Sequence, residues 1–120
     1  MAFDRTVLDN GATVVSETMP WVRSITLGFW YRVGSRHETA EQAGLTHFME
    51  HMMFKGTSTR TAINISEAFD ALGAESNAFT SKEYTCYYAR FVDDRLDDVL
   101  ELLSDMVLNS TFSEDDILTE

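Results

Sequence analysis

The sequence has little cysteine, proline or positive charge, and each shortage narrows what the chain can be. The single cysteine, Cys86, excludes an internal disulfide framework and is typical of a reducing compartment. The chain has 20 aspartate and glutamate residues but only 9 lysine and arginine residues, so the net charge is −11. Nucleic acid is therefore not expected as a partner, because phosphate binding requires clustered basic side chains.

Long apolar runs and a leader segment are also missing. No stretch approaches the roughly 18 consecutive apolar residues that a membrane-spanning helix needs. No basic and then apolar leader precedes the first strand-like residues, so no signal peptide is visible. We therefore expect a cytoplasmic protein without a membrane span. At 120 residues, with 44% hydrophobic and 24% charged residues, residues 1–120 form one globular domain or part of one.

The chemistry of the chain is concentrated in His47-Phe48-Met49-Glu50-His51. Residues four apart on a helix lie on the same face, about one turn apart, so both imidazoles can reach one metal ion. Glu50 projects from a neighbouring part of that face, within reach of a metal-bound water. The pattern is the zinc-peptidase motif in inverted order, His-x-x-Glu-His.

The alternative is a pair of ordinary histidines that occur at helical spacing by chance. The apolar flanking residues Leu45, Phe48, Met52 and Phe54 are typical of a buried helix. Buried histidines and a buried glutamate need partners, which a metal ion or a hydrogen-bond network would supply. The motif alone thus favours a metal site over ordinary histidines and leaves both open.

Hydrophobic patterns predict the strands around this helix. Residues 6–8 and 12–15 flank Asn10-Gly11, a turn typical of a β-hairpin. Residues 24–33 alternate as in a half-buried strand, and two further strands are expected at 75–81 and 84–91. The apolar face of the 24–33 strand would carry Ile25, Leu27, Phe29, Tyr31 and Val33.

Three helices are predicted between and after these strands. The motif helix would run over 44–54, with Gly56 as its stop, and a second helix over 62–72 with Gly73 as its stop. A third would follow Asp93 or Asp94 as N-cap. Its apolar stripe would comprise Leu96, Val99, Leu100, Leu103, Met106 and Val107. This order predicts an α+β fold, with an antiparallel or mixed sheet and the helices packed on one face.

A fourth helix is expected to begin near Ser113, where acidic residues follow a capping serine. The sequence stops at Glu120, before that helix is long enough to be complete. We therefore expect that the chain is truncated.

Several segments together resemble the pitrilysin-type zinc peptidases, which include bacterial and mitochondrial processing peptidases and insulin-degrading enzyme. The matching segments are LDNG at 8–11, VGSR at 33–36 with Glu38, GLTHFMEHMMFKGT at 44–57, GAESNAFTS at 73–81 and YTCYY at 84–88. The resemblance covers nearly the whole chain, and several motifs in one order are far more specific than one pentapeptide. It implies that residues 1–120 are the amino-terminal part of a single metallopeptidase domain.

The resemblance also implies roles for particular residues. His47 and His51 would bind Zn2+, one ion per active site, and Glu50 would be the general base that acts on a zinc-bound water. Asn77 and Ala78 match the strand that holds the substrate in extended form. Glu120 falls where the family has a glutamate that orients a ligand histidine. Arg36 and Glu38 also match, but no chemistry is assigned to them; an ion pair that fixes the loop is the simple alternative.

The resemblance leaves the site incomplete within this chain. The third zinc ligand of the family is a glutamate far beyond His51, outside residues 1–120. The active site of family members is closed by a second homologous half or by a partner subunit. The implied function is a zinc-dependent metalloendopeptidase that cleaves extended peptides or presequences, although this chain alone is expected to be inactive.

Two other functions remain open at this point. Relatives of the same fold include non-catalytic scaffold or partner subunits, but these tend to lose the metal motif that is present here. The third function is that of a stand-alone binding module, in which the chain by itself holds peptides without cutting them. Zinc stoichiometry together with a peptide-cleavage assay separates the three.

Overall fold

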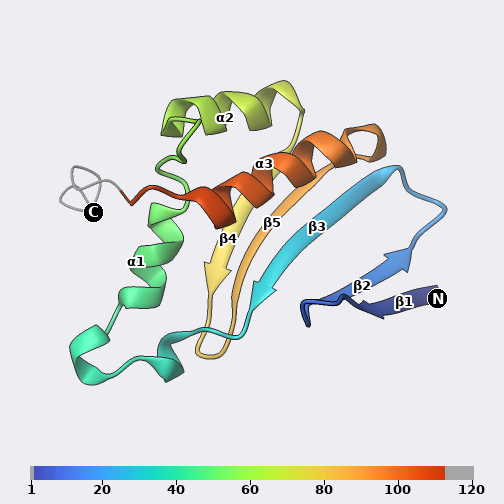
Figure 1. Ribbon diagram of the computed structural model, residues 1–120. Coiled ribbons are helices and arrows are strands. Elements are labelled where there is room, and N and C mark those ends of the chain that lie inside the picture. Colours follow the sequence, from blue (N-terminus) through green and yellow to red (C-terminus); the bar gives the residue numbers. More distant parts are fainter. Residues whose placement is uncertain (1, 113–120) are drawn as a thin grey trace.

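The computed structural model describes residues 2–112, and its helices and strands follow the predicted order (Figure 1). The strands are β1 (Ala2–Val7), β2 (Thr13–Thr18), β3 (Ser24–Tyr31), β4 (Glu75–Thr80) and β5 (Thr85–Val92). The helices are α1 (Leu45–Met52), α2 (Ala62–Ala71) and α3 (Leu96–Asn109). The fold is α+β with antiparallel strands, as the sequence pattern predicted.

The main sheet has the order β3-β5-β4, with β5 in the centre. β4 and β5, which follow each other in the sequence, form a hairpin. Both pairings are antiparallel, and Tyr87 on β5 lies between Phe29 on β3 and Ala78 on β4. β1 and β2 pair in a separate two-stranded sheet around Gly11, which has a φ of 90°. Among the described residues, β4 therefore has one side without a neighbouring strand, on the side where α1 lies.

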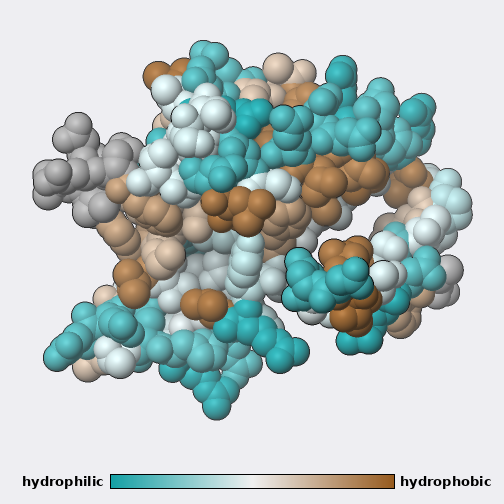
Figure 2. All heavy atoms as spheres, viewed as in Figure 1, coloured by the Kyte–Doolittle hydropathy of each residue, from teal (hydrophilic) through white to brown (hydrophobic). Residues whose placement is uncertain are grey.

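The core lies between this sheet and the helices α2 and α3. Alternation on the strands and helical spacing on the helices turn one apolar face of each element inward. The buried members are Ile65, Phe69, Ala89, Phe91, Val99, Leu102, Leu103 and Met106, with Ile25, Leu27 and Phe29 packed against them. Figure 2 shows hydrophilic residues over the outer surface of α2 and α3, and hydrophobic residues beneath α3 and on the β1–β2 hairpin.

Two details of α3 differ from the prediction. Asp93 and Asp94 form a short 3₁₀ turn, and neither caps α3, which starts after Arg95 without a side-chain cap. Asp93 instead forms an ion pair with Arg23, at 3.1 Å between Nη2 and Oδ1. The buried stripe is rotated from the predicted one: Leu102 is buried, whereas Leu100 is 41% exposed and Leu96 is 37% exposed.

The motif helix is also shorter than predicted. α1 ends at Met52 and the chain continues in hydrogen-bonded turns, with Lys55 N–H donating to the Met52 carbonyl. Gly56 lies in an isolated β-bridge with Thr61, and Thr57 in another with Ser110. These bridges direct the segment toward the end of α3, so the helix cannot continue to Gly56.

The predicted fourth helix from Ser113, and Glu120, lie outside the described residues. Within residues 2–112, none of the helices combines the length and the apolar character that crossing a membrane would require.

Candidate metal site

The metal motif lies on α1, and the start of this helix is set by residues before it. Gly44, the N-cap, has a φ of 87°, a left-handed conformation that favours glycine, and it supplies no side chain to cap the helix. Glu38 takes that role from the preceding loop: its Oε1 accepts the Gly44 N–H and its Oε2 accepts the Thr46 N–H, both at 2.8 Å. Hydrogen bonds from the Thr46 side chain and backbone, and from the Gly44 backbone, hold the pKa of Glu38 below its ordinary range.

The far end of α1 is fixed through the loop that follows it. Met52 is fully buried, which anchors the last turn in the protein. Beyond it, Thr57 donates its hydroxyl to Asp105 on α3 at 2.7 Å, and Arg60 donates to the same carboxylate oxygen at 2.6 Å. α1 is thus tied at its start to the loop before it and at its end to α3.

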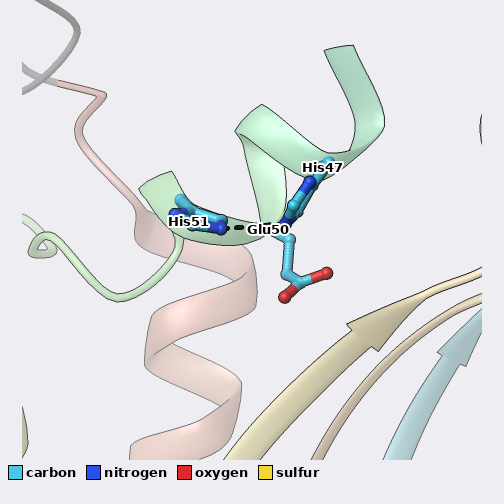
Figure 3. Close-up of side chains that lie close together, drawn as sticks. All are labelled: His47, Glu50 and His51. Atoms are coloured by element: carbon cyan, nitrogen blue, oxygen red, sulfur yellow. Dashed lines mark hydrogen bonds between the residues drawn. The ribbon is translucent and has the colours of Figure 1, made fainter. Parts of the chain in front are cut away.

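The three motif side chains lie close together beside α1: the two imidazoles face each other, and the Glu50 carboxylate extends from between them toward the sheet (Figure 3). The Nε2 atoms of His47 and His51 lie 3.0 Å apart, and one oxygen of Glu50 lies within 4.8 Å of both ring nitrogens. Two imidazole nitrogens bound to one zinc ion at about 2.0–2.1 Å in tetrahedral geometry lie about 3.3 Å apart. The donor set therefore fits a zinc ion with little movement.

The site is more open than the apolar flanks suggested. His47 and His51 are exposed and Glu50 is half-buried, so the expectation of a buried cluster is wrong. The reason is that α1 buries its other side, where Thr46 and Met52 face the protein. The histidines are therefore not buried groups that require a metal ion as a partner. A metal site is favoured instead by the distance between their ring nitrogens.

Glu50 projects from α1 toward the sheet (Figure 3), and its negative charge acts on the phenol of Tyr87 on β5. Burial of the phenol, followed by the negative charges of Glu50 and Tyr31, raises the pKa of Tyr87 to about 12. Tyr87 therefore stays neutral beside the carboxylate. Nothing local in the sequence linked Tyr87 to Glu50, because the two are brought together only by the packing of α1 against the sheet.

Asn77 and Ala78 lie on β4, as predicted, and β4 is a strand at the edge of the sheet. The Asn77 Oδ1 atom accepts the N–H of Ala78 at 2.8 Å. A pocket of about 350 Å³ links the end of this strand to the motif, since His47 lines it together with Thr80 and Ser81. Strand and motif are therefore neighbours in space, although about thirty positions separate Asn77 from His47.

Glu38 is the residue near the site for which sequence reasoning found no role. It was considered only for an ion pair that fixes the loop, yet Arg36 pairs with Glu83 and Glu38 binds the start of α1. A glycine at the start of a helix, with an acidic residue a few positions earlier, was the available signal. Cys86 is 1% exposed, and its burial raises the pKa of the thiol.

Fold and motif together are those of a peptidase with an inverted zinc motif. The model of the insulinase family (peptidase family M16) matches residues 13–120. The chain therefore belongs to this family.

Two curated relatives and one solved structure agree with that membership. A protein of Bacillus subtilis named as an uncharacterized zinc protease is 51% identical over 116 residues, which cover 97% of this chain and 28% of the relative. A protein of Streptomyces coelicolor with the same description is also 51% identical, over 97% of this chain and 25% of its own length. The crystal structure of a protease from Helicobacter pylori superimposes with a TM-score of 0.93 at 31% identity, covering 98% of this chain and 29% of that one.

Two conclusions follow from these relatives. The family and the names of its members imply Zn2+ as the cofactor, and His47, Glu50 and His51 form a group that can hold it. The chain spans little more than a quarter of the length of the relatives it matches.

Proposed function

We propose that this chain carries the zinc-binding and proton-transferring part of a metalloendopeptidase. His47 and His51 would bind the ion through their Nε2 atoms, and Glu50 would act as the general base. The observation that carries the proposal is the 3.0 Å separation of the two ring nitrogens with the Glu50 carboxylate beside them. The chemistry that a bound zinc supplies is Lewis acidity, which acidifies water and polarises carbonyl groups.

The position of Glu50 supports the proposed role as base. It is the one member of the group that is half-buried, and it lies between α1 and the sheet rather than in open solvent. Its carboxylate would take a proton from the attacking water as the C–O bond forms. It would then deliver that proton to the amine nitrogen as the C–N bond breaks, so that it ends in its starting state.

Within residues 2–112, no strand pairs with the outer side of β4, which supports a place for the substrate. An extended peptide added to an edge strand gains main-chain hydrogen bonds, as β-strand addition does elsewhere. Asn77 and Ala78 would contribute to this strand, and the Ala78 N–H, now bound by the Asn77 side chain, is a donor that a peptide carbonyl can take. Because β4 leads to the pocket beside His47, a peptide along it would pass the motif.

The proposal also includes parts of the active site that lie outside the described residues. Residues 1–120 would be the amino-terminal part of a metallopeptidase domain, and a glutamate outside them would complete the zinc ligands. Glu120 would orient a ligand histidine. A second homologous half or a partner subunit would close the site. The low coverage of the relatives, between 25% and 29% of their lengths, is consistent with such further parts.

The test uses the chain extended to the full length of its relatives, with zinc content and peptide cleavage both measured. Glu50→Gln should keep one zinc per active site and lose about 10²–10⁴-fold in kcat, because the proton acceptor is gone. His51→Ala should lose the zinc and the activity together. Glu67→Gln, which changes an exposed carboxylate on α2 outside the group, should leave both unchanged.

Each alternative function predicts a different pattern. Retained turnover in Glu50→Gln would remove Glu50 from the role of base, and unchanged zinc content in His51→Ala would overturn the ligand assignment. A wild-type protein that binds zinc and peptide but cleaves nothing would be a binding module. A wild-type protein without zinc would be a scaffold of this fold.

A further inference from the structure

The start of α1 has an unusual form for a helix that must present two metal ligands. The first N–H groups of a helix have no acceptor within the helix, and a serine, threonine, aspartate or asparagine at the N-cap normally supplies one. Gly44 occupies that position here and has no side chain to offer. The acceptors must therefore come from elsewhere in the chain.

Glu38 supplies both with one carboxylate. Its two oxygens accept the Gly44 and Thr46 N–H groups at the same distance, 2.8 Å, and Thr46 is buried and directly precedes His47. A negative charge at this end of a helix is also favoured by the helix dipole. The carboxylate thus holds the turn from which the first proposed zinc ligand projects.

The loop that carries Glu38 is itself fixed to the β4–β5 turn. The Ser35 N–H donates to the Ser81 carbonyl at 3.2 Å, and the Arg36 N–H donates to the Lys82 carbonyl at 2.8 Å. Arg36 also pairs with Glu83 in the same turn. Glu38 is therefore the side chain through which the end of the edge strand β4 and the start of α1 are joined.

We infer that Glu38 is a positioning residue for the metal site, which sets the start of α1, and with it His47, relative to the β4–β5 turn. This inference rests on the proposed function. A carboxylate is needed because both partners, the Gly44 and Thr46 N–H groups, are donors. A glutamine offers only one acceptor oxygen, and its NH2 group would face the other N–H. The role is distinct from ligation, since no contact of Glu38 with His47, Glu50 or His51 is needed for it.

The experiment measures zinc affinity, by competition with a chromogenic chelator, in the chain extended to the length of its relatives. Glu38→Gln should weaken zinc binding about tenfold, as loss of a residue that orients metal ligands does. Glu41→Gln removes the same charge from the same loop and should leave affinity unchanged. Thr61→Ala removes the N-cap of α2, where the Thr61 hydroxyl accepts the Asn64 N–H at 3.1 Å. It should lower stability without changing zinc affinity.

Amide hydrogen exchange gives a second readout that does not depend on the metal. In Glu38→Gln, exchange at Gly44 and Thr46 should become faster, while Thr61→Ala should change exchange only in α2. Unchanged zinc affinity in Glu38→Gln, when the wild type binds zinc, would overturn the inference and leave the proposed function intact. An equal loss of affinity in Thr61→Ala would also overturn it, because the effect would then be one of general stability. A wild type that binds no zinc would overturn the proposed function itself.

Discussion

At Gly34, the absence of one methyl group lets two segments of the chain come into contact. Gly34 is buried against the β4–β5 turn, and a Cβ atom there would lie 2.4 Å from the Ser81 carbonyl oxygen and 2.5 Å from the Lys82 carbonyl carbon. Both are backbone atoms, so they can move only if the turn moves. The contact that Glu38 depends on is therefore decided partly by a residue with no side chain.

We predict that Gly34→Ala destabilises the protein by about 1–3 kcal/mol, the usual cost of forcing extra volume into a packed region. Gly28→Ala is the matched control. Its Cβ would meet the Trp30 Nε1 atom at 3.0 Å and the Cys86 Sγ atom at 3.4 Å, and the tryptophan side chain can turn aside. Urea unfolding of the three proteins measures the difference. An equal loss in both variants would contradict the steric explanation.

At the scale of elements, α3 and the loop after α1 are joined through one carboxylate. Asp105 accepts hydrogen bonds from Thr57, Arg60 and Asn109, at 2.7, 2.6 and 2.8 Å. Burial alone would raise the pKa of Asp105, but these hydrogen bonds and the charge of Arg60 outweigh it and hold the pKa below its ordinary value of 3.8. The carboxylate thus favours the folded state when it is ionised.

The sign of the pH dependence follows from that lowered pKa. The stabilisation by Asp105 should be fully present above pH 3.8 and should disappear as the pH falls through the lower folded value. We predict that Asp105→Asn costs about 1–3 kcal/mol near neutral pH, and that the difference from wild type shrinks in strongly acidic solution. Glu67→Gln, at an exposed position on α2, is the control and should change little. A difference that is constant with pH would contradict the assignment.

The predictions for helices and strands were correct where they rested on a repeating pattern of apolar residues. The alternation from Ile25 to Phe29 correctly assigned the face of β3 that packs on the core, because strand geometry turns every second residue the same way. The predicted cap of α3 was wrong, since Asp93 is drawn into an ion pair with Arg23, seventy positions away. An aspartate can cap a helix only if no other group binds its carboxylate, and a residue far away in the sequence can be that group.

At the scale of the whole molecule, metal binding should be linked to folding. An ion bound only by the folded protein stabilises it by mass action, by about 2.7 kcal/mol when free zinc is a hundredfold above its dissociation constant. We predict that zinc raises the unfolding temperature of the extended chain and that a chelator reverses the effect. The 120-residue chain should gain less at the same zinc concentration, because the proposed third ligand is not in it.

His51→Ala is the matched variant for this measurement. It should unfold at the same temperature with zinc and with chelator, since one of the two proposed imidazole ligands is gone. Glu67→Gln, at an exposed position on α2, should respond like the wild type. A response of His51→Ala equal to that of the wild type would show that the stabilising zinc binds elsewhere.

The sequence by itself determined the parts of this protein that depend on neighbouring residues. The spacing of His47 and His51 places both imidazoles on one face of any α-helix, and the alternating strands and helical stripes specify an α+β fold. Tertiary structure alone decided that α1 leaves its histidines exposed, that β4 is an edge strand beside them, and that Glu38 holds the start of α1. Periodicity is a local property of the chain, whereas these features depend on which distant segments pack together, and many sequences with the same local pattern can pack differently.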